Sequence, residues 1–283
     1  MWVPVTQPLD LALTLRSGQV FRWKFHQGWW SGFIGSELFF LRQIDGGLEA
    51  ITKSLNSTEI NSYLEWFFRL DDDLAQVYRD LSSDKWIAAS CKTYVGMRLL
   101  RQEPWECLIG FMSSTASNIP RITRVQEGLA EEFGQPVFVN GIKRNTFPDP
   151  ATVSMAGLPA LRKLGLGYRA RYVDLVSTKI ASGEFVLSEL EQLAYEPGRD
   201  KLLSLPGVGA KVADCVQLFA FGNLESFPVD RWVRRALEQW YFDGIKRSDK
   251  DLGDWARGVF SPWAGYAQQY LFFSSRDAKL FDS

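Results

Sequence analysis

Residues 201–241 place two side chains that could do chemistry, Lys211 and Asp230, at the starts of two expected helices. Lys211 comes two residues after the turn at 205–209 (LPGVG), where a cation opposes the helix dipole and therefore suggests a functional role. A lysine amine can act as a nucleophile, and a carboxylate can stabilise positive charge that develops nearby. The pair offers both groups without requiring a metal or an organic cofactor.

The turn before Lys211 has the composition of an anion-binding turn. Pro206 ends the preceding helix, while Gly207 and Gly209 leave the main chain bare. Such a turn, running into a helix start, presents free N–H groups and the positive end of a helix dipole, which suits a phosphate. We therefore expect a helix–hairpin–helix over 199–221. Its second helix is predicted by apolar residues at helical spacing: Val212, Cys215, Val216, Phe219 and Ala220.

Asp230 precedes a further apolar stripe and is expected to be the N-cap of that helix. Each of the two candidate residues also has a plainer interpretation. Lys211 could be a surface lysine that contacts phosphate, and Asp230 could serve only as a cap. The hairpin alone does not separate these alternatives, since helix–hairpin–helix modules also occur in DNA-binding proteins without catalytic activity.

The segments around these residues resemble the helix–hairpin–helix DNA glycosylase superfamily. Within it, the branch of bifunctional 8-oxoguanine DNA glycosylase/AP lyases of the eukaryotic type is most similar to LPGVGAKVADC (205–215) and PVDRW (228–232). Further motifs of that branch follow in order along the chain: GMRLLRQEPWECLIGF (96–111), NIPRIT (118–123), LRKLGLGYRARY (161–172) and GYAQQYLFF (265–273). The resemblance covers most of the chain and is more specific than one hairpin motif.

The composition is that of a folded protein with one or two domains. The chain has 283 residues, of which 46% are hydrophobic and 14% aromatic, and it carries a net charge of −1. That charge argues against binding to nucleic acid by bulk electrostatics, so a DNA-binding function would require positive charge gathered on one face. No apolar run is long enough for a membrane span, and the first residues do not resemble a signal peptide.

Three widely spaced cysteines, Cys91, Cys107 and Cys215, favour a reducing compartment over a disulfide framework. They are also too few for the four-cysteine iron–sulfur loop of many relatives in the superfamily. We therefore expect an intracellular protein that acts on DNA, in the nucleus of a eukaryote or the cytoplasm of a prokaryote. We expect it to be a monomer without an iron–sulfur cluster.

The predicted fold class is α+β. Residues 1–95 are expected to form an antiparallel sheet of hairpins, with strands at 11–15, 20–25, 29–34, 38–42 and 48–52. A helix that starts at a capping box of Asn56 and Glu59 should cover this sheet, and the resemblance implies a TATA-binding-protein-like topology. Residues 96–283 should form a helical glycosylase domain packed on it. Pro104 is read there as the first residue of a helix, and Asp149-Pro150 and Ser261-Pro262 are each read as a cap followed by a proline at the first helical position.

The resemblance implies the reaction and the pocket. A glycosylase of this branch flips the target nucleotide out of the duplex, and its lysine captures C1′ of the sugar as a Schiff base, which leads to β-elimination. Lys211 and Asp230 match the catalytic positions. The lesion pocket would use the carbonyl of Gly18 as acceptor for N7–H of 8-oxoguanine, a donor that guanine lacks. The remaining pocket positions match Cys215, Pro228, Gln268 and Phe272.

The resemblance also implies which residues fill the gap in the duplex and hold the orphaned base, and here the sequence departs from the family. The matching positions are Asn118, Arg121, Tyr168 and Arg169. The family's run of three asparagines reads Ala116-Ser117-Asn118, which affects the expected preference for cytosine opposite the lesion. A histidine usual in the family is replaced by Trp232, so that its phosphate contact must be absent or made by an arginine such as Arg231 or Arg234.

Two other functions remain open at this point. One is a helix–hairpin–helix glycosylase that removes a different base, although Lys211 argues against members that use only water. The other is a damage-sensing DNA-binding protein without chemistry, which would have no need for Lys211 beside Asp230.

Overall fold

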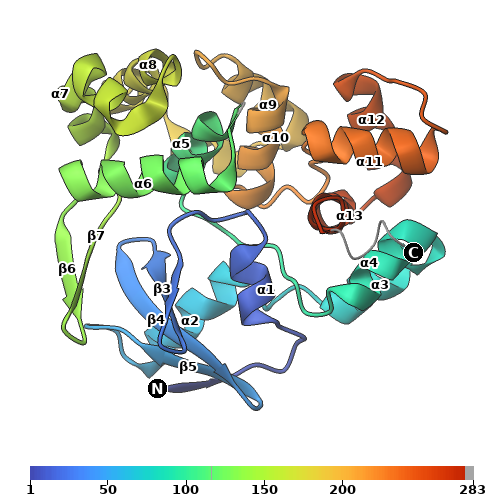
Figure 1. The fold of residues 1–283 in the computed structure, drawn as a ribbon, viewed down its shortest axis with the longest axis horizontal. Helices are drawn as coiled ribbons and strands as arrows, with labels where there is room; N and C mark the ends of the chain where they lie inside the picture. The colour runs from blue at the N-terminus through green and yellow to red at the C-terminus, as the bar shows by residue number, and fades with distance from the viewer. Residues whose placement is uncertain (116, 278–283) are drawn as a thin grey trace.

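A computed structural model describes residues 1–115 and 117–277 of the chain (Figure 1). Its N-terminal part is a five-stranded antiparallel sheet in the order β1-β5-β4-β3-β2. Helix α2 (Ser57–Phe67) covers one face, where Ile60 and Leu64 join a buried cluster with residues of β3 and β4. The predicted capping box of Asn56 and Glu59 is confirmed. The strands are β1 (Trp2–Pro4), β2 (Lys24–His26), β3 (Trp29–Ile34), β4 (Glu37–Ile44) and β5 (Gly47–Ile51).

The strand predicted at 11–15 is wrong, because this segment forms helix α1 (Leu11–Arg16). Asp10 caps it by accepting a hydrogen bond from the Leu13 amide at 2.8 Å. The buried residues are Leu11, Thr14 and Leu15, whose spacing is helical. The alternation of leucines at every second position, which suggested a strand, therefore does not match the buried face. The strand predicted at 20–25 shrinks to β2, and β1 was not predicted at all.

A second hairpin covers the other face of the sheet and was also missed. It consists of β6 (Pro136–Val139) and β7 (Ile142–Asn145). Asn140 and Gly141 both have positive φ, of 55° and 75°, as a two-residue hairpin turn requires, so this Asn-Gly pair was an unused signal. Val139 packs with Phe33, Leu38 and Phe40, which makes the sheet the middle layer.

The rest of the described chain is mainly helical (Figure 1), and most of its buried apolar side chains belong to one large cluster. Helices do begin at Pro104 and Pro150, as predicted. The prediction that Pro262 is the first residue of a helix is wrong, because Trp263 is the N-cap of α13. The Ser261–Pro262 peptide bond is cis. The helices are α3 (Leu74–Asp80), η1 (Leu81–Ser83), α4 (Lys85–Thr93), α5 (Pro104–Ser114), α6 (Ile119–Phe133), α7 (Pro150–Leu161), η2 (Arg162–Leu166), α8 (Arg169–Ala181), η3 (Leu187–Gln192), α9 (Tyr195–Leu203), α10 (Ala210–Phe219), α11 (Arg231–Tyr241), α12 (Asp249–Phe260) and α13 (Ala264–Ser274).

Helices α3 and α4 contribute to the helical core although they lie before the predicted domain boundary near residue 95. Leu74, Val77 and Ile87 belong to the same buried cluster as residues of α10 and α13. The division at that residue therefore stays a prediction, and the two parts meet through an extensive buried junction.

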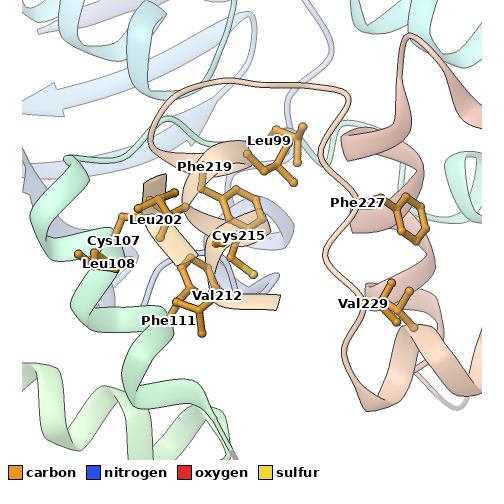
Figure 2. Packing of buried hydrophobic residues seen from close by; sticks show 14 of the residues in the cluster. Leu99, Cys107, Leu108, Phe111, Leu202, Val212, Cys215, Phe219, Phe227 and Val229 are labelled. Carbon is orange, nitrogen blue, oxygen red and sulfur yellow. The ribbon is translucent and has the colours of Figure 1, made fainter. Parts of the chain in front are cut away.

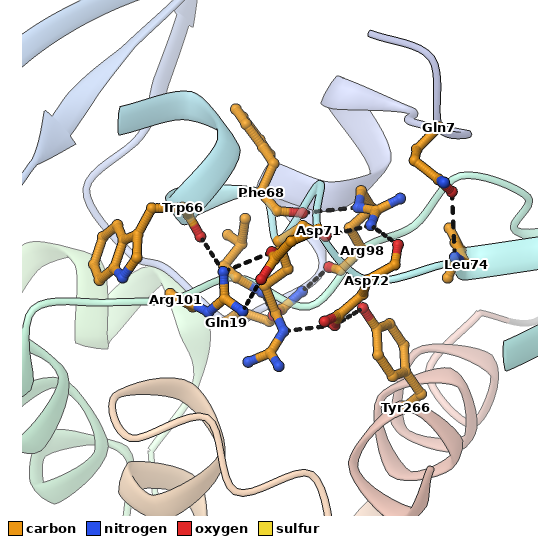
Figure 3. A network of polar contacts seen from close by, with 12 residues as sticks. Gln7, Gln19, Trp66, Phe68, Asp71, Asp72, Leu74, Arg98, Arg101 and Tyr266 are labelled. Carbon is orange, nitrogen blue, oxygen red and sulfur yellow. Dashed lines mark hydrogen bonds and ion pairs between the residues drawn. The ribbon is translucent and has the colours of Figure 1, made fainter. Parts of the chain in front are cut away.

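A fully buried arginine ties this junction together (Figure 3). Arg98 donates hydrogen bonds to the carbonyls of Phe68 at 2.7 Å, Asp72 at 2.8 Å and Pro8 at 3.0 Å, and also to that of Arg69. Its own carbonyl accepts from Gln19 at 2.9 Å. One guanidinium thus satisfies four carbonyls from two segments, each of which would be costly to bury without a donor.

We expect Arg98→Met to lower the free energy of unfolding by roughly 3–5 kcal/mol, because several buried carbonyls lose their donor at once. Arg101→Met is the matched control. Arg101 lies in the same network, but its partner Asp71 is exposed, so the loss should stay below about 1 kcal/mol. Urea denaturation of both variants measures the difference, and equal losses would contradict the role assigned to Arg98.

Candidate active site

The turn of the helix–hairpin–helix presents bare, exposed backbone in front of α10. Gly207 has a φ of +78°, and a Cβ there would lie 2.5 Å from the Tyr172 ring, so glycine is required on two grounds. Gly209 is exposed with open space around it and is the N-cap of α10. The first amides of α10 therefore point toward solvent, in an arrangement suited to an anion.

Lys211 lies in the first turn of α10, and its side chain is held against α5. Its Nζ donates a hydrogen bond to Ser114 Oγ at 2.8 Å. The same nitrogen lies 4.8 Å from the centroid of the Phe111 ring. The side chain is half-buried, so the amine rests on a protein surface instead of extending into bulk solvent.

Cys215 lies one turn further along α10, inside the core with Val212 and Phe219 and close to Phe111 of α5 (Figure 2). Burial raises the pKa of its thiol to about 12, while nearby Lys211 lowers that pKa and Asp230 raises it. Two opposite charges thus act on one buried thiol. Because the thiol stays protonated, Lys211 is the better candidate for a nucleophile.

Asp230 is the N-cap of α11, as predicted. Its Oδ1 accepts hydrogen bonds from the amides of Trp232 and Val233, both at 2.9 Å. These two bonds hold the carboxylate in one orientation. The neighbouring Arg231 stacks on the Trp232 ring at 5.1 Å, and Arg234 is bound by Asp249 at 2.6 Å.

The predicted pocket residues gather around α13. Gln268 is 5% exposed, and its Nε2 donates to the carbonyl of Pro228 at 3.1 Å. Its Oε1 is buried and has no hydrogen-bond partner in the described part of the chain, which leaves an acceptor for a ligand. Gly18 has a φ of +87°, and a Cβ there would lie 3.2 Å from Cε1 of Phe272. A side chain at this position would crowd the stacking ring.

The loop that carries Gly18 is fixed from both sides. The Ser17 carbonyl accepts from Gln269 of α13 at 3.2 Å, and Gln19 Oε1 accepts from the Leu100 amide at 2.8 Å. A cavity of about 340 Å³ opens beside Gly18, between the sheet and α6. Its walls include Phe21, Trp23, Phe25, Trp30 and Ile119.

The residues expected to contact DNA differ in orientation. Tyr168 is 60% exposed, and Arg121 is exposed while its Nη2 donates to the Gly165 carbonyl at 3.1 Å. Asn118 caps α6 by accepting from the Arg121 amide at 3.0 Å. Arg169 is instead buried and donates to the carbonyls of Thr115 and Leu166. Ala116 lies outside the described residues.

Three residues at the site were not predicted: Phe111, Ser114 and Arg276. The first two lie on α5, far from Lys211 in sequence, and no local pattern links them to it. Arg276 could have been found, because it follows Gln268 and Phe272 at steps of four residues, the spacing of one helix face. Its guanidinium carbon lies 5.0 Å from the centroid of the Phe272 ring.

Within residues 1–115 and 117–277, no three histidine, cysteine, aspartate or glutamate side chains come together as a metal site. None of the helices in that part of the chain combines the length and hydropathy that a membrane span requires.

We expect all three cysteines to be inert in the native protein. Burial raises the pKa of Cys91 and Cys215 to about 12 and that of Cys107 well above the normal value, because a thiolate is poorly solvated in the core. At pH 8 a pKa near 12 leaves about one thiolate in 10,000. A colorimetric thiol reagent should therefore detect no thiol at pH 8 until denaturant is added, and a rapidly reacting native thiol would contradict this burial.

Two family models match adjoining parts of the chain. The model of the 8-oxoguanine DNA glycosylase N-terminal domain matches residues 3–108. The model of the HhH-GPD superfamily of base excision DNA repair proteins matches residues 109–253 and includes Lys211 and Asp230.

Relatives are similar over nearly the whole chain. A probable N-glycosylase/DNA lyase of Methanothermobacter thermautotrophicus is 30% identical, with 100% of this chain and 98% of the relative covered. An N-glycosylase/DNA lyase of Arabidopsis thaliana is 31% identical, with 98% and 81% covered. The solved structure of Clostridium acetobutylicum 8-oxoguanine glycosylase/lyase, in complex with double-stranded DNA containing cytosine opposite 8-oxoG, is 27% identical with a TM-score of 0.91, covering 98% and 97%.

The fold bears out the predicted class, an antiparallel sheet domain packed on a helical helix–hairpin–helix domain. With the matching models and relatives, it follows that this chain is a DNA N-glycosylase/lyase and belongs to the 8-oxoguanine DNA glycosylase family of the helix–hairpin–helix base-excision repair superfamily.

Proposed function

We propose that the protein removes 8-oxoguanine and related oxidised purines from duplex DNA, preferentially opposite cytosine, and then cleaves the strand through a Schiff base at Lys211. The observation that carries this proposal is the Lys211 amine at the start of α10, hydrogen-bonded to Ser114 and lying over the Phe111 ring, in a chain that also fixes the Asp230 carboxylate at the start of α11. The relative solved with cytosine opposite 8-oxoG supports the choice of substrate.

The target base must leave the duplex to reach this pocket. Phe272 offers a face on which the base stacks, and the unpartnered Oε1 of Gln268 accepts a hydrogen bond from the Watson–Crick edge. The carbonyl of Gly18 accepts from N7–H, which 8-oxoguanine has and guanine lacks. A guanine would leave that acceptor unpaired, at a cost of about 1–3 kcal/mol.

The chemistry then uses the two helix starts. The Lys211 amine attacks C1′, the bond from C1′ to N9 breaks, and the base departs with the bonding electrons and a proton from the amine. Asp230 stabilises the positive charge that builds up on the sugar. The C1′–O4′ bond then breaks and O4′ takes up a proton, so that the sugar ring opens and an iminium forms at C1′. The iminium acidifies C2′, and loss of the C2′ proton expels the 3′ phosphate by β-elimination.

The DNA contacts follow from the same arrangement. The amides around Gly207 and Gly209 would bind a backbone phosphate, while Asn118, Arg121 and Tyr168 would meet the gap and the orphaned base. Arg169 would take part through Tyr168, on whose ring its guanidinium stacks at 4.5 Å. We further propose that the enzyme acts as a monomer inside the cell, without an iron–sulfur cluster.

Borohydride trapping tests the nucleophile. On a duplex with 8-oxoguanine opposite cytosine, the native protein should give a covalent adduct, and Lys211→Gln should give none and lose at least about a thousandfold in excision rate. Lys201→Gln is the control, because Lys201 lies on the preceding helix and is bound by Glu189. Repeating the assay with each base opposite the lesion measures the preference. Excision without a covalent adduct would indicate a glycosylase that uses water as its nucleophile. Binding to the duplex with neither excision nor an adduct would indicate a damage sensor.

Two substitutions separate the contribution of Asp230 to capping α11 from the contribution of its negative charge to the reaction. Asp230→Asn keeps a good N-cap, so the free energy of unfolding should change by less than about 0.5 kcal/mol, whereas Asp230→Ala should lose about 1 kcal/mol. Both variants should lose about a hundredfold or more in excision rate, because both lack the negative charge. Single-turnover kinetics and thermal denaturation measure the two effects. Full activity in Asp230→Asn would contradict the charge role.

A further inference from the structure

Arg276 reaches the proposed base pocket from the end of α13. Its backbone amide donates a hydrogen bond to the Phe273 carbonyl at 3.1 Å, which continues the helical turn beyond Ser274. The guanidinium carbon lies 5.0 Å from the centroid of the Phe272 ring, and a Cβ on Gly18 would lie 3.3 Å from Nη1. The cation thus lies beside both the ring on which a base would stack and the glycine whose carbonyl would bind N7–H.

The guanidinium is charged and has free donors. Partial desolvation lowers the pKa of Arg276, Asp230 raises it and Arg231 lowers it, but an arginine remains protonated throughout. Among the described residues it has no hydrogen-bond or ion-pair partner, so its donors are left to water. A base that entered the pocket would displace part of that water, and the donors would then need new acceptors.

The chemistry of the damaged base indicates which acceptor is in reach. Along one edge, 8-oxoguanine presents N7–H, then the C8 carbonyl, then N9 with the sugar attached. Gly18 is proposed at N7–H, and Asp230 is proposed at the sugar. Arg276 lies against both Gly18 and Phe272, so a base that stacks on this ring with N7–H at Gly18 would bring its C8 carbonyl, the next group along that edge, within reach of the guanidinium.

We propose that Arg276 is a specificity-determining residue that donates a hydrogen bond to O8 of the flipped 8-oxoguanine. This inference rests on the proposed function and adds a second means of rejecting guanine. Guanine carries C8–H in place of the carbonyl, so the guanidinium would lose water without gaining an acceptor. The lesion would then be read at two adjacent atoms, N7–H by a carbonyl acceptor and O8 by a cationic donor.

The test compares two activities of the same enzyme, because an abasic site has lost the base. Single-turnover excision of 8-oxoguanine and strand cleavage at a preformed abasic site, both opposite cytosine, would be measured for native protein, Arg276→Ala and Arg276→Lys. We expect Arg276→Ala to slow excision about 10- to 150-fold, the effect of losing a charged hydrogen bond, with abasic-site cleavage within about twofold of native. Arg276→Lys, which keeps a donor, should fall in between.

Arg247→Ala is the matched control. Its guanidinium also stacks on a phenylalanine, Phe242, at 5.0 Å, but it lies in the loop after α11 and has no part in the proposed site, so both activities should stay near native. Arg276 is exposed, and unchanged thermal midpoints would exclude a folding defect.

Three results would overturn the inference. Equal loss of both activities would make Arg276 a phosphate contact, and faster excision in Arg276→Ala would make it a group that only blocks the pocket. Unchanged excision would exclude a contact with the base. If native protein itself neither excises 8-oxoguanine nor forms an adduct, the proposed function fails, and this assignment fails with it.

Discussion

The packing of α10 against α5 determines where the Lys211 amine can lie. Every residue of α10 from Val212 to Phe219 is buried, and Phe219 stacks on Phe111 of α5 with ring centroids 5.3 Å apart. The helix can neither rotate nor slide without exposing apolar surface or opening a void, both of which are costly. The first turn of α10 is the part left accessible, and there the amine meets Phe111 and Ser114. A flexible side chain thereby receives a defined position from the core.

The other components reach this position through separate constraints. Gly18 comes from the loop between α1 and β2, which Gln19 and Arg98 connect to the junction of the two domains. Pro228 is held by Gln268 of α13, and Asp230 is fixed by the start of α11. No single element carries the site. Its residues come together only when the sheet domain and the helical domain pack against each other. The buried hydrogen bonds of Gln19 and Arg98 stabilise that junction.

Local chemistry made part of this arrangement predictable. The Asn56 capping box, the Asp230 cap and the buried stripe of α10 depend on residues within one or two helical turns, and a sequence displays such patterns directly. The second hairpin was missed although its Asn140-Gly141 turn is a local signal, whereas the other failures depended on distant partners. The leucines of α1 alternate like a strand, but a cap at Asp10 and burial against the sheet select the helix.

Long-range contacts explain the remaining differences at the site. Arg169 was expected at the DNA surface, yet the carbonyl of Thr115, brought close by the fold, binds its guanidinium inside the protein. Phe111 and Ser114 could not be linked to Lys211 from sequence, because their meeting is set by how α5 and α10 cross. Gly18 and Phe272 were brought together only by the family resemblance, and the geometry places them in contact range.

The Asp230 side chain caps α11 and, in the proposed mechanism, also supplies the negative charge beside the sugar. Oδ1 alone takes both amide hydrogen bonds of the cap, which leaves Oδ2 without a hydrogen-bond partner in the described chain. The cap therefore fixes the orientation of the carboxylate and does not occupy all of its acceptor capacity. Because the amides are neutral donors, they also leave the net negative charge intact. A salt bridge with Arg231 would have oriented the group equally well, but it would have neutralised the charge that the proposed mechanism requires beside the sugar. Orientation by backbone amides is thus the arrangement that keeps the carboxylate both rigid and available.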